Sequence, residues 1–354
     1  MLKQKSQLET IQVLRGVASL LVVLFHVTIN AKAILKKDFC FDFFLFGGSG
    51  VDIFFVLSGF IITYTSSKGI GRFNKLLPFL RRRFVRIFPT YWIITGLFLL
   101  FQVAFPSFYK TPYYFDIENF LSTWFLVPGH IMVNGVSWTL SCELFFYALF
   151  SFAFLIPNRK IAFILFGLYI LTIIAIALMG VNPEDYGKWT GLAAFPMNIE
   201  FFMGVLAAVL IPHLPRHWSL PMIISGSLLF LASALFFNQG IHLVPNGFNR
   251  VLLFGIPSFL IIAGLVRFEL YSKINVHNWL LSLGEASYSL YLLHLPVIVA
   301  GIRAIAGFNW SNDFVLHTVL LLMTGVICFT SVLFFKWIER PLIDKLNKRT
   351  QKQP

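Results

Sequence analysis

The chain has 354 residues, of which 28 are Lys or Arg and 15 are Asp or Glu, so its net charge is +13. Hydrophobic residues make up 58% of the sequence and charged residues only 12%. A soluble domain carries about 25% charged residues, so this composition excludes a soluble globular protein. The basic residues lie between apolar segments, which is typical of membrane topology signals and does not indicate a nucleic-acid partner.

The apolar segments predict an all-α polytopic membrane protein. A membrane span takes about 20 apolar residues, and ten such segments occur in chain order, at residues 11–31, 48–66, 87–106, 137–157, 161–180, 190–211, 219–238, 250–267, 284–306 and 314–338. We expect one transmembrane domain over residues 1–345 and a polar tail over 346–354.

Ten crossings place both termini on one side of the membrane. Lys and Arg concentrate in the terminal and alternate connecting segments, which predicts that this side is cytoplasmic. The longest connection on the opposite side, residues 107–136, is expected to form a lid or re-entrant element. Three widely separated cysteines predict neither a disulfide framework nor a zinc site, and we expect no metal.

The first predicted helix carries Arg15 and His26. They are eleven residues apart, so they share one helix face and are separated by about 16 Å of rise. Small residues such as Gly16 permit close approach of a neighbouring helix. Histidine has a pKa suited to general-base activation of a hydroxyl, but a structural histidine and a snorkelling arginine explain the pattern equally well.

Acidic residues occupy the second and fourth helices at about the depth of His26. Asp52 can orient an imidazole or cap the start of its helix. Ionisable side chains inside a membrane mark function or pair with one another, so Glu143 is expected to line a sugar-binding cavity or to pair with a buried Arg or His. Possible acceptor-binding or structural neighbours on the fourth helix are Trp138, Ser141 and Tyr147.

An arginine block precedes the third predicted helix. Arg83 and Arg86 are three residues apart, hence on one face of a helix, with Arg81 and Arg82 beside them. Guanidinium groups bind phosphates in planar, bidentate geometry, which suits a nucleotide-tailed donor. The alternatives are a topology signal and a site for anionic lipids.

Two features remain near the end of the chain. Tyr291 and His294 lie on the ninth helix, where we expect them to hydrogen-bond across the bundle in a mainly structural role. The sequence ERPL is expected to end the last helix, with Glu339 pairing with a nearby arginine.

Six motifs in order give the chain a family resemblance. They read LRGVASLLVVLFH, GVDIFFVLSGFII, RRRFVRIFPTYW, SWTLSCELFFYAL, SYSLYLLHLPV and ERPL. The chain resembles the acyltransferase-3 family, membrane enzymes that O-acetylate bacterial surface polysaccharides. The resemblance implies an inner-membrane enzyme with no bound cofactor, which uses acyl-CoA (acetyl-CoA) as donor substrate and a carbohydrate or glycolipid as acceptor. Membrane lipids and polysaccharide-synthesis machinery are the further partners it suggests.

By the same resemblance His26 is the catalytic histidine and Arg15 its partner. Arg83 and Arg86, with Arg82 beside them, are implied to serve the donor, and Asp52 and Glu143 match acidic positions of the family motifs. The main alternative is a glycolipid or acyl-carrier transporter or flippase. Transporters show paired repeats and broken helices, which this sequence lacks. A non-enzymatic partner of a polysaccharide synthase is a third possibility.

Overall fold

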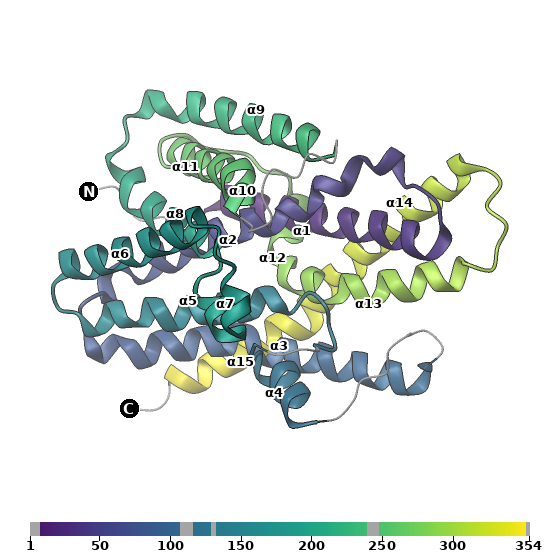
Figure 1. The fold of residues 1–354 in the computed structure, drawn as a ribbon, viewed down its shortest axis with the longest axis horizontal. Coiled ribbons are helices and arrows are strands. Elements are labelled where there is room, and N and C mark those ends of the chain that lie inside the picture. Colours follow the sequence, from purple (N-terminus) through teal and green to yellow (C-terminus); the bar gives the residue numbers. More distant parts are fainter. Residues whose placement is uncertain (1–7, 107–115, 129–131, 239–247, 352–354) are drawn as a thin grey trace. The chain divides into compact units, whose positions relative to one another are not determined.

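A computed structural model describes all residues except 1–7, 107–115, 129–131, 239–247 and 352–354 (Figure 1). Every regular element in the described residues is helical. The α-helices are α1 Glu9–Asn30, α2 Gly50–Ser66, α3 Leu76–Ala104, α4 Ile117–Phe125, α5 Trp138–Leu155, α6 Arg159–Leu178, α7 Lys188–Ala193, α8 Asn198–Leu210, α9 Ser219–Asn238, α10 Phe248–Arg250, α11 Ile256–Glu269, α12 Asn278–Glu285, α13 Ser287–Ile305, α14 Asp313–Phe334 and α15 Arg340–Gln351.

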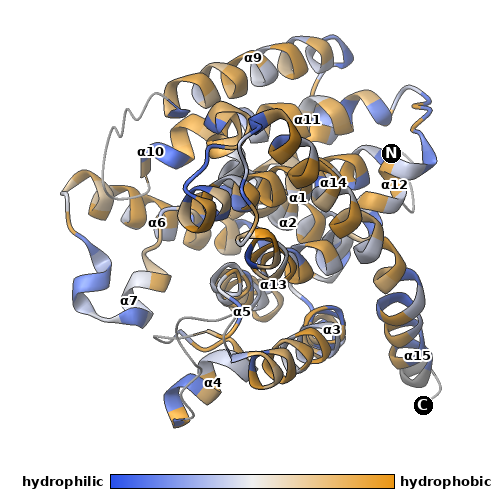
Figure 2. Ribbon diagram, turned by 90° about the vertical axis from the view of Figure 1, so that its right-hand side faces the viewer, coloured by the Kyte–Doolittle hydropathy of each residue, from blue (hydrophilic) through white to orange (hydrophobic). Residues whose placement is uncertain are grey.

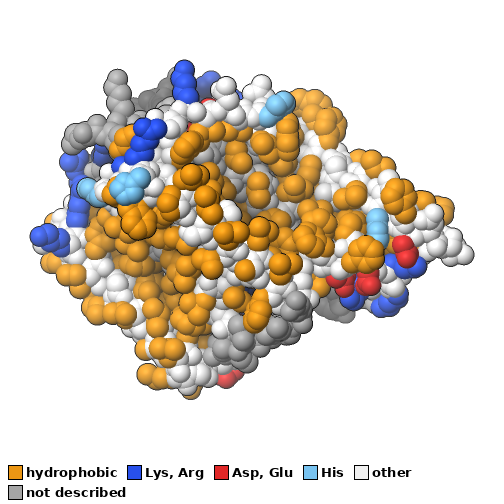
Figure 3. Space-filling model, turned by 90° about the horizontal axis from the view of Figure 1, so that it is seen from above, with side chains coloured by type: hydrophobic (Ala, Val, Ile, Leu, Met, Phe, Trp, Pro, Cys, Tyr) orange, Lys and Arg blue, Asp and Glu red, His pale blue; other side chains and the backbone are white. Residues whose placement is uncertain are grey.

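Ten helical segments in the described part of the chain are long and apolar enough to cross a membrane, as predicted. Orange, the colour of hydrophobic residues, makes up much of the ribbon of the long helices in Figure 2. Hydrophobic side chains also dominate the face drawn in Figure 3. Helix α9, for example, exposes Leu220, Ile224, Leu228, Leu231 and Leu235. Large exposed apolar surfaces of this kind mark contact with lipid or with another protein.

Two predicted helix ends were wrong. Helix α3 begins at Leu76, so the arginine block lies inside the helix; arginine is a good helix former, and a helix can extend beyond its apolar span. The last helix does not end at the ERPL sequence, because a π-helical turn at Phe335–Glu339 leads directly into α15. Pro341 is tolerated there because the π-turn has already shifted the ladder of backbone hydrogen bonds. Helix α15 continues into the expected polar tail as far as Gln351.

The chain divides into two compact units. Unit 1 comprises residues 1–18, 51–81 and 142–284, and unit 2 comprises residues 19–50, 82–141 and 285–354. The division falls well inside helices α1, α3 and α5, and it also separates the first residue of α2 and the last residue of α12 from the rest of those helices.

In unit 1, glycines bring helices into backbone contact. A Cβ atom added at Gly59 of α2 would lie 1.9 Å from the carbonyl oxygen of Phe201 in α8. A Cβ atom added at Gly204 of α8 would lie 2.0 Å from the carbonyl oxygen of Val56 in α2. Gly16 of α1 shows the close approach expected from the sequence, since its Cβ would lie 3.2 Å from the backbone nitrogen of Gly284. Only glycine fits at the α2 and α8 positions, so these two helices form a tightly packed pair.

A carboxylate in unit 1 caps the start of α1. Glu269, the last residue of α11, accepts hydrogen bonds from the backbone nitrogens of Glu9 and Thr10, each at 2.9 Å, and from the Thr10 hydroxyl at 2.5 Å. The first N–H groups of a helix have no partner within the helix, and the helix dipole favours a negative charge at that end. Glu269 therefore anchors the N-terminus of α1.

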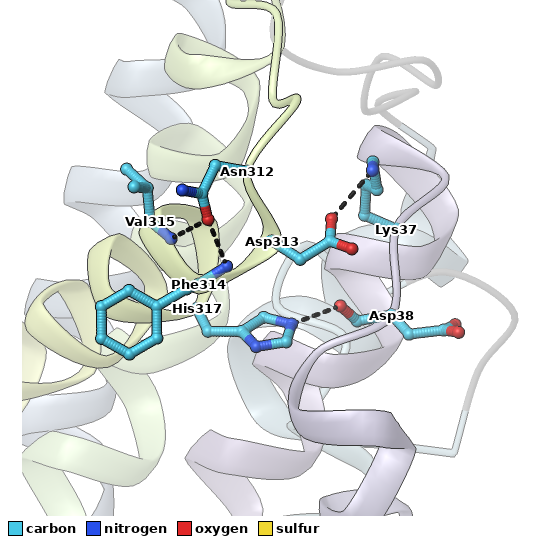
Figure 4. A network of polar contacts seen from close by, with 7 residues as sticks. All are labelled: Lys37, Asp38, Asn312, Asp313, Phe314, Val315 and His317. Carbon is cyan, nitrogen blue, oxygen red and sulfur yellow. Dashed lines mark hydrogen bonds and ion pairs between the residues drawn. The ribbon is translucent and has the colours of Figure 1, made fainter.

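In unit 2, the start of α14 is tied to the segment that follows α1 (Figure 4). Lys37 forms an ion pair with Asp313 at 2.9 Å, and Nε2 of His317 lies 3.1 Å from the carbonyl oxygen of Asp38. The side chain of Asn312 accepts from the backbone nitrogens of residues 314 and 315 and so caps α14.

The expected lid is described only in part, because residues 107–115 and 129–131 lie outside the described residues. Helix α4 lies between them and packs on α3 through hydrogen bonds from Tyr91 and Trp92 to backbone carbonyls of α4, at 2.6 and 2.8 Å. Its buried side is polar (Asn119, Ser122 and Thr123) and its exposed side is apolar (Ile117, Leu121 and Phe125). This arrangement suits a helix at a membrane interface. The lid itself stays a prediction.

Candidate active site

Two imidazole rings meet in unit 2. His26 comes from α1 and His294 from α13, and Nδ1 of His26 lies 3.2 Å from Nε2 of His294, with ring centroids 4.8 Å apart. Nδ1 of His26 also lies 2.8 Å from the carbonyl oxygen of Val22, and Nδ1 of His294 lies 3.1 Å from that of Leu290. His294 is fully buried, whereas His26 is half-buried. The structure therefore gives His294 a hydrogen bond across the helices, as the sequence led us to expect, and its partner is the predicted catalytic histidine.

Polar side chains hold α13 in this position. Pro296 has no N–H, so it leaves the carbonyl of Leu292, four residues earlier, without its usual helical donor. The side-chain amide of Asn134 donates to that carbonyl at 2.9 Å. One helical turn before His294 on α13, the Tyr291 hydroxyl lies 2.8 Å from the hydroxyl of Thr139 at the start of α5. These contacts fix the buried imidazole of His294 against residues 134–139, where the motif SWTLSCELFFYAL begins.

The neighbouring candidates from that motif differ in exposure. Trp138 is 40% exposed, whereas Ser141 is buried and its hydroxyl has no hydrogen-bond partner among the described residues. An exposed indole at a helix start suits stacking on a sugar ring, and a buried hydroxyl without a partner is available to a ligand. Their assignment to the acceptor stays a prediction.

Arg82, Arg83 and Arg86 lie in the first turns of α3 and share one side of the helix in unit 2. In this block Arg82 is exposed, and Arg83 and Arg86 are half-buried. The Tyr288 hydroxyl of α13 donates to the carbonyl oxygen of Ile87 at 2.9 Å, so α13 touches α3 beside the block. Tyr288 and His294 are six residues apart, or about 9 Å along α13. Helix α13 therefore links the basic surface with the imidazole pair within one unit.

Unit 1 holds a separate ion pair. Both carboxylate oxygens of Asp52 accept from Arg250: Nε lies 3.0 and 2.9 Å from them, and Nη2 lies 2.7 Å from Oδ2. Asp52 is fully buried, and so is Glu200, whose carboxyl group lies beside the pair. His26 belongs to unit 2, so its predicted pairing with Asp52 stays a prediction.

The sequence reasoning missed Arg250 and Glu200. Glu200 is an acidic residue inside the predicted helix 190–211, and Arg250 is the first residue of the predicted helix 250–267. Both were visible as charges inside apolar segments, which was the signal that could have found them.

The other predicted catalytic residues also lie in unit 1. Glu143 accepts a hydrogen bond from the Ser58 hydroxyl at 3.1 Å and another from the hydroxyl of Tyr147, so its described partners in this unit are hydroxyl groups. Nη1 of Arg15 lies 3.3 Å from Oε1 of Gln12. A carboxylate that accepts from two hydroxyls keeps lone pairs for a further donor.

The part of the chain that the structure describes has ten long apolar helices with ionisable groups buried among them, which define an integral, multi-pass membrane protein. A family model described as an acyltransferase domain matches residues 8–335. The chain belongs to this acyltransferase family, as the sequence motifs predicted, and it is an acyltransferase.

Three relatives extend this comparison. The exopolysaccharide production protein ExoZ of Rhizobium meliloti is 26% identical over 329 residues, which cover 86% of this chain and 92% of ExoZ. The acyltransferase MdmB of Streptomyces mycarofaciens is 25% identical, over 86% of this chain and 82% of MdmB. The O-acetyltransferase OatA of Staphylococcus aureus is 27% identical over 81% of this chain but only 50% of OatA. No solved structure matches the chain.

Proposed function

We propose that this enzyme transfers an acetyl group from acetyl-CoA to a hydroxyl of a cell-surface polysaccharide or glycolipid precursor in the bacterial inner membrane, with both termini in the cytoplasm. The observation that carries the proposal is the buried imidazole pair, which α13 links to a basic surface within unit 2. The names of the relatives support the acceptor class, since ExoZ is an exopolysaccharide production protein and OatA an O-acetyltransferase.

In this proposal the donor phosphates bind to Arg83 and Arg86, with Arg82 at the exposed edge of the same surface. Guanidinium groups hold phosphates in bidentate geometry and stay charged at any physiological pH. The pantetheine arm then runs alongside α13 from the basic surface toward the imidazole pair, a rise of about 9 Å between Tyr288 and His294. The thioester is thereby brought to His26.

His26 acts as the general base. It removes the proton from the acceptor hydroxyl, and the oxygen attacks the thioester carbonyl to form a C–O bond. The C–S bond breaks, and the coenzyme A thiolate takes the proton back from the imidazolium, which returns His26 to its starting state. A covalent acyl-histidine intermediate is the alternative route to the same products. Arg15, Asp52 and Glu143 stay in the proposal as predicted catalytic residues.

The test compares His26→Ala with a matched control, His317→Ala, whose imidazole lies outside the pair on α14. Cells lacking the gene are complemented with each form at equal membrane abundance, and the ester content of their surface glycans is measured by proton NMR. We expect His26→Ala to lose at least about 100-fold in acyl transfer, since general-base catalysis contributes about 10²- to 10⁴-fold. His317→Ala should retain the wild-type ester content.

Two outcomes contradict the proposal. Ester content that survives in His26→Ala removes this histidine from the mechanism. Unchanged glycans in the deletion strain, together with loss of lipid-linked sugar transport, favour a flippase.

A further inference from the structure

The hydrogen bonds around the imidazole pair determine which ring nitrogens carry protons. Nδ1 of His26 faces the carbonyl oxygen of Val22, and Nδ1 of His294 faces that of Leu290. A carbonyl oxygen only accepts hydrogen bonds, so each Nδ1 must carry a hydrogen. A neutral imidazole has one N–H, which leaves both Nε2 atoms without a proton.

The contact between the rings agrees with this assignment. Nε2 of His294, as an unprotonated nitrogen, accepts from the Nδ1–H of His26 at 3.2 Å, so this N–H is shared between Val22 and His294. The opposite tautomers would point the Nδ1 lone pair of each ring at a carbonyl oxygen, at 2.8 and 3.1 Å. Two buried repulsions of that kind are unfavourable, because an unmade hydrogen bond in a low-dielectric interior costs about 1–3 kcal/mol.

We propose that His294 is a positioning residue that, together with the carbonyl of Val22, holds His26 in the Nδ1–H tautomer. Nε2 of His26 is then the nitrogen that takes the proton from the acceptor hydroxyl. This assignment rests on the proposed acyl transfer. Within the described residues of unit 2, no hydrogen bond engages Nε2 of His26. His26 is half-buried, whereas His294 is fully buried and is not itself placed to meet a substrate.

The surroundings of His294 hold it in place as a hydrogen-bond acceptor for His26. Its own tautomer is set by Leu290, its helix is held by the amide of Asn134 on the Leu292 carbonyl, and Tyr291 is held by Thr139. A rigid second residue that fixes the tautomer of a reactive imidazole is the arrangement that catalytic and metal-binding histidines share.

Two variants separate positioning from packing. In His294→Gln the amide oxygen occupies the place of Nε2 and still accepts from His26, whereas the shorter amide of His294→Asn reaches only the place of Nδ1. We expect His294→Asn to lower kcat about 10- to 100-fold, the loss typical of such supporting residues, with an unchanged KM for acetyl-CoA. His294→Gln should restore kcat to within a few-fold of the wild type.

A second measurement is independent of activity. Histidine-selective ¹³C and ¹⁵N NMR of the full-length wild-type protein in detergent reports the tautomer of each ring, and the signals of His26 are assigned by their loss in His26→Gln. We expect the Nδ1–H form at His26 in the wild type and in His294→Gln. In His294→Asn the carbonyl of Val22 is the remaining acceptor, and we expect a larger share of the Nε2–H form than in the wild type.

The outcomes distinguish the two proposals. An Nε2–H tautomer at wild-type His26, or equal kcat values for His294→Asn and His294→Gln, overturns the positioning role. Ester formation that persists in His26→Ala overturns the proposed function instead, whatever the tautomer.

Discussion

The Asp52–Arg250 pair of unit 1 and the His26–His294 pair of unit 2 are both buried polar contacts between distant parts of the sequence, but they differ in what they leave available. Every carboxylate oxygen of Asp52 is engaged by the guanidinium of Arg250. In the imidazole pair, one nitrogen of His26 keeps an unused lone pair within the described residues of its unit. A closed ion pair holds helices together, whereas a pair with one open nitrogen can exchange a proton.

The largest expected effect is on stability in unit 1. Arg250→Ala leaves the fully buried Asp52 carboxylate without its bidentate partner, and we expect the free energy of unfolding to fall by about 3 kcal/mol. Titration with SDS in mixed micelles measures this change. The control is Arg159→Ala, which removes an exposed arginine from the same unit and should change the stability by less than about 0.5 kcal/mol. Equal effects of the two substitutions would show that the ion pair does not stabilise unit 1.

A smaller loss is expected where α13 is anchored in unit 2. Asn134→Ala leaves the carbonyl of Leu292 unpaired, which should cost about 1–3 kcal/mol in the same titration. Pro296→Ala is the matched partner, because it restores a backbone N–H four residues after Leu292. The cost of Asn134→Ala should therefore be smaller in the Pro296→Ala background. An identical cost in both backgrounds would mean that Asn134 stabilises α13 in another way.

The smallest effect is expected for Glu200→Gln, which tests whether the Asp52–Arg250 region has only a structural role. Glu200→Gln keeps the shape of a fully buried side chain beside Asp52 and replaces its carboxyl group with an amide, so we expect stability to be unchanged or slightly raised and acyl transfer to stay at the wild-type level. Ester content of surface glycans and the SDS midpoint measure the two quantities. A fall in transfer of about tenfold or more, with an unchanged midpoint, would assign Glu200 a part in the chemistry.

The ten membrane helices could be predicted because apolar segments of sufficient length are a strong and local signal. The ends of α3 and α14 could not, because hydropathy reports where the apolar span ends and carries no information on where the backbone hydrogen bonds end. The arginine block lies in the part of α3 that precedes the apolar run. Pro341 follows a π-turn that no sequence pattern predicted.

The residues of the candidate site were largely visible in the sequence, but their partners were not. His26 and His294 each stood out as ionisable groups in apolar helices, yet they are 268 positions apart and only packing shows that they touch. The same holds for Asp52, whose partner Arg250 is 198 positions away. Long-range pairing depends on which helix faces meet, and a single sequence does not encode that in any short pattern.

The cap on α1 also bears on how the protein is made. The helix that carries His26 is synthesised before α11, and the acceptor for its leading amide groups, Glu269, lies 260 positions beyond Glu9. Until α11 has entered the bilayer, the opening turn of α1 must satisfy these groups with water or lipid headgroups. The amino end of the reactive helix is therefore completed only after most of the polypeptide has been inserted, so a chain released before α11 would lack a fixed first turn.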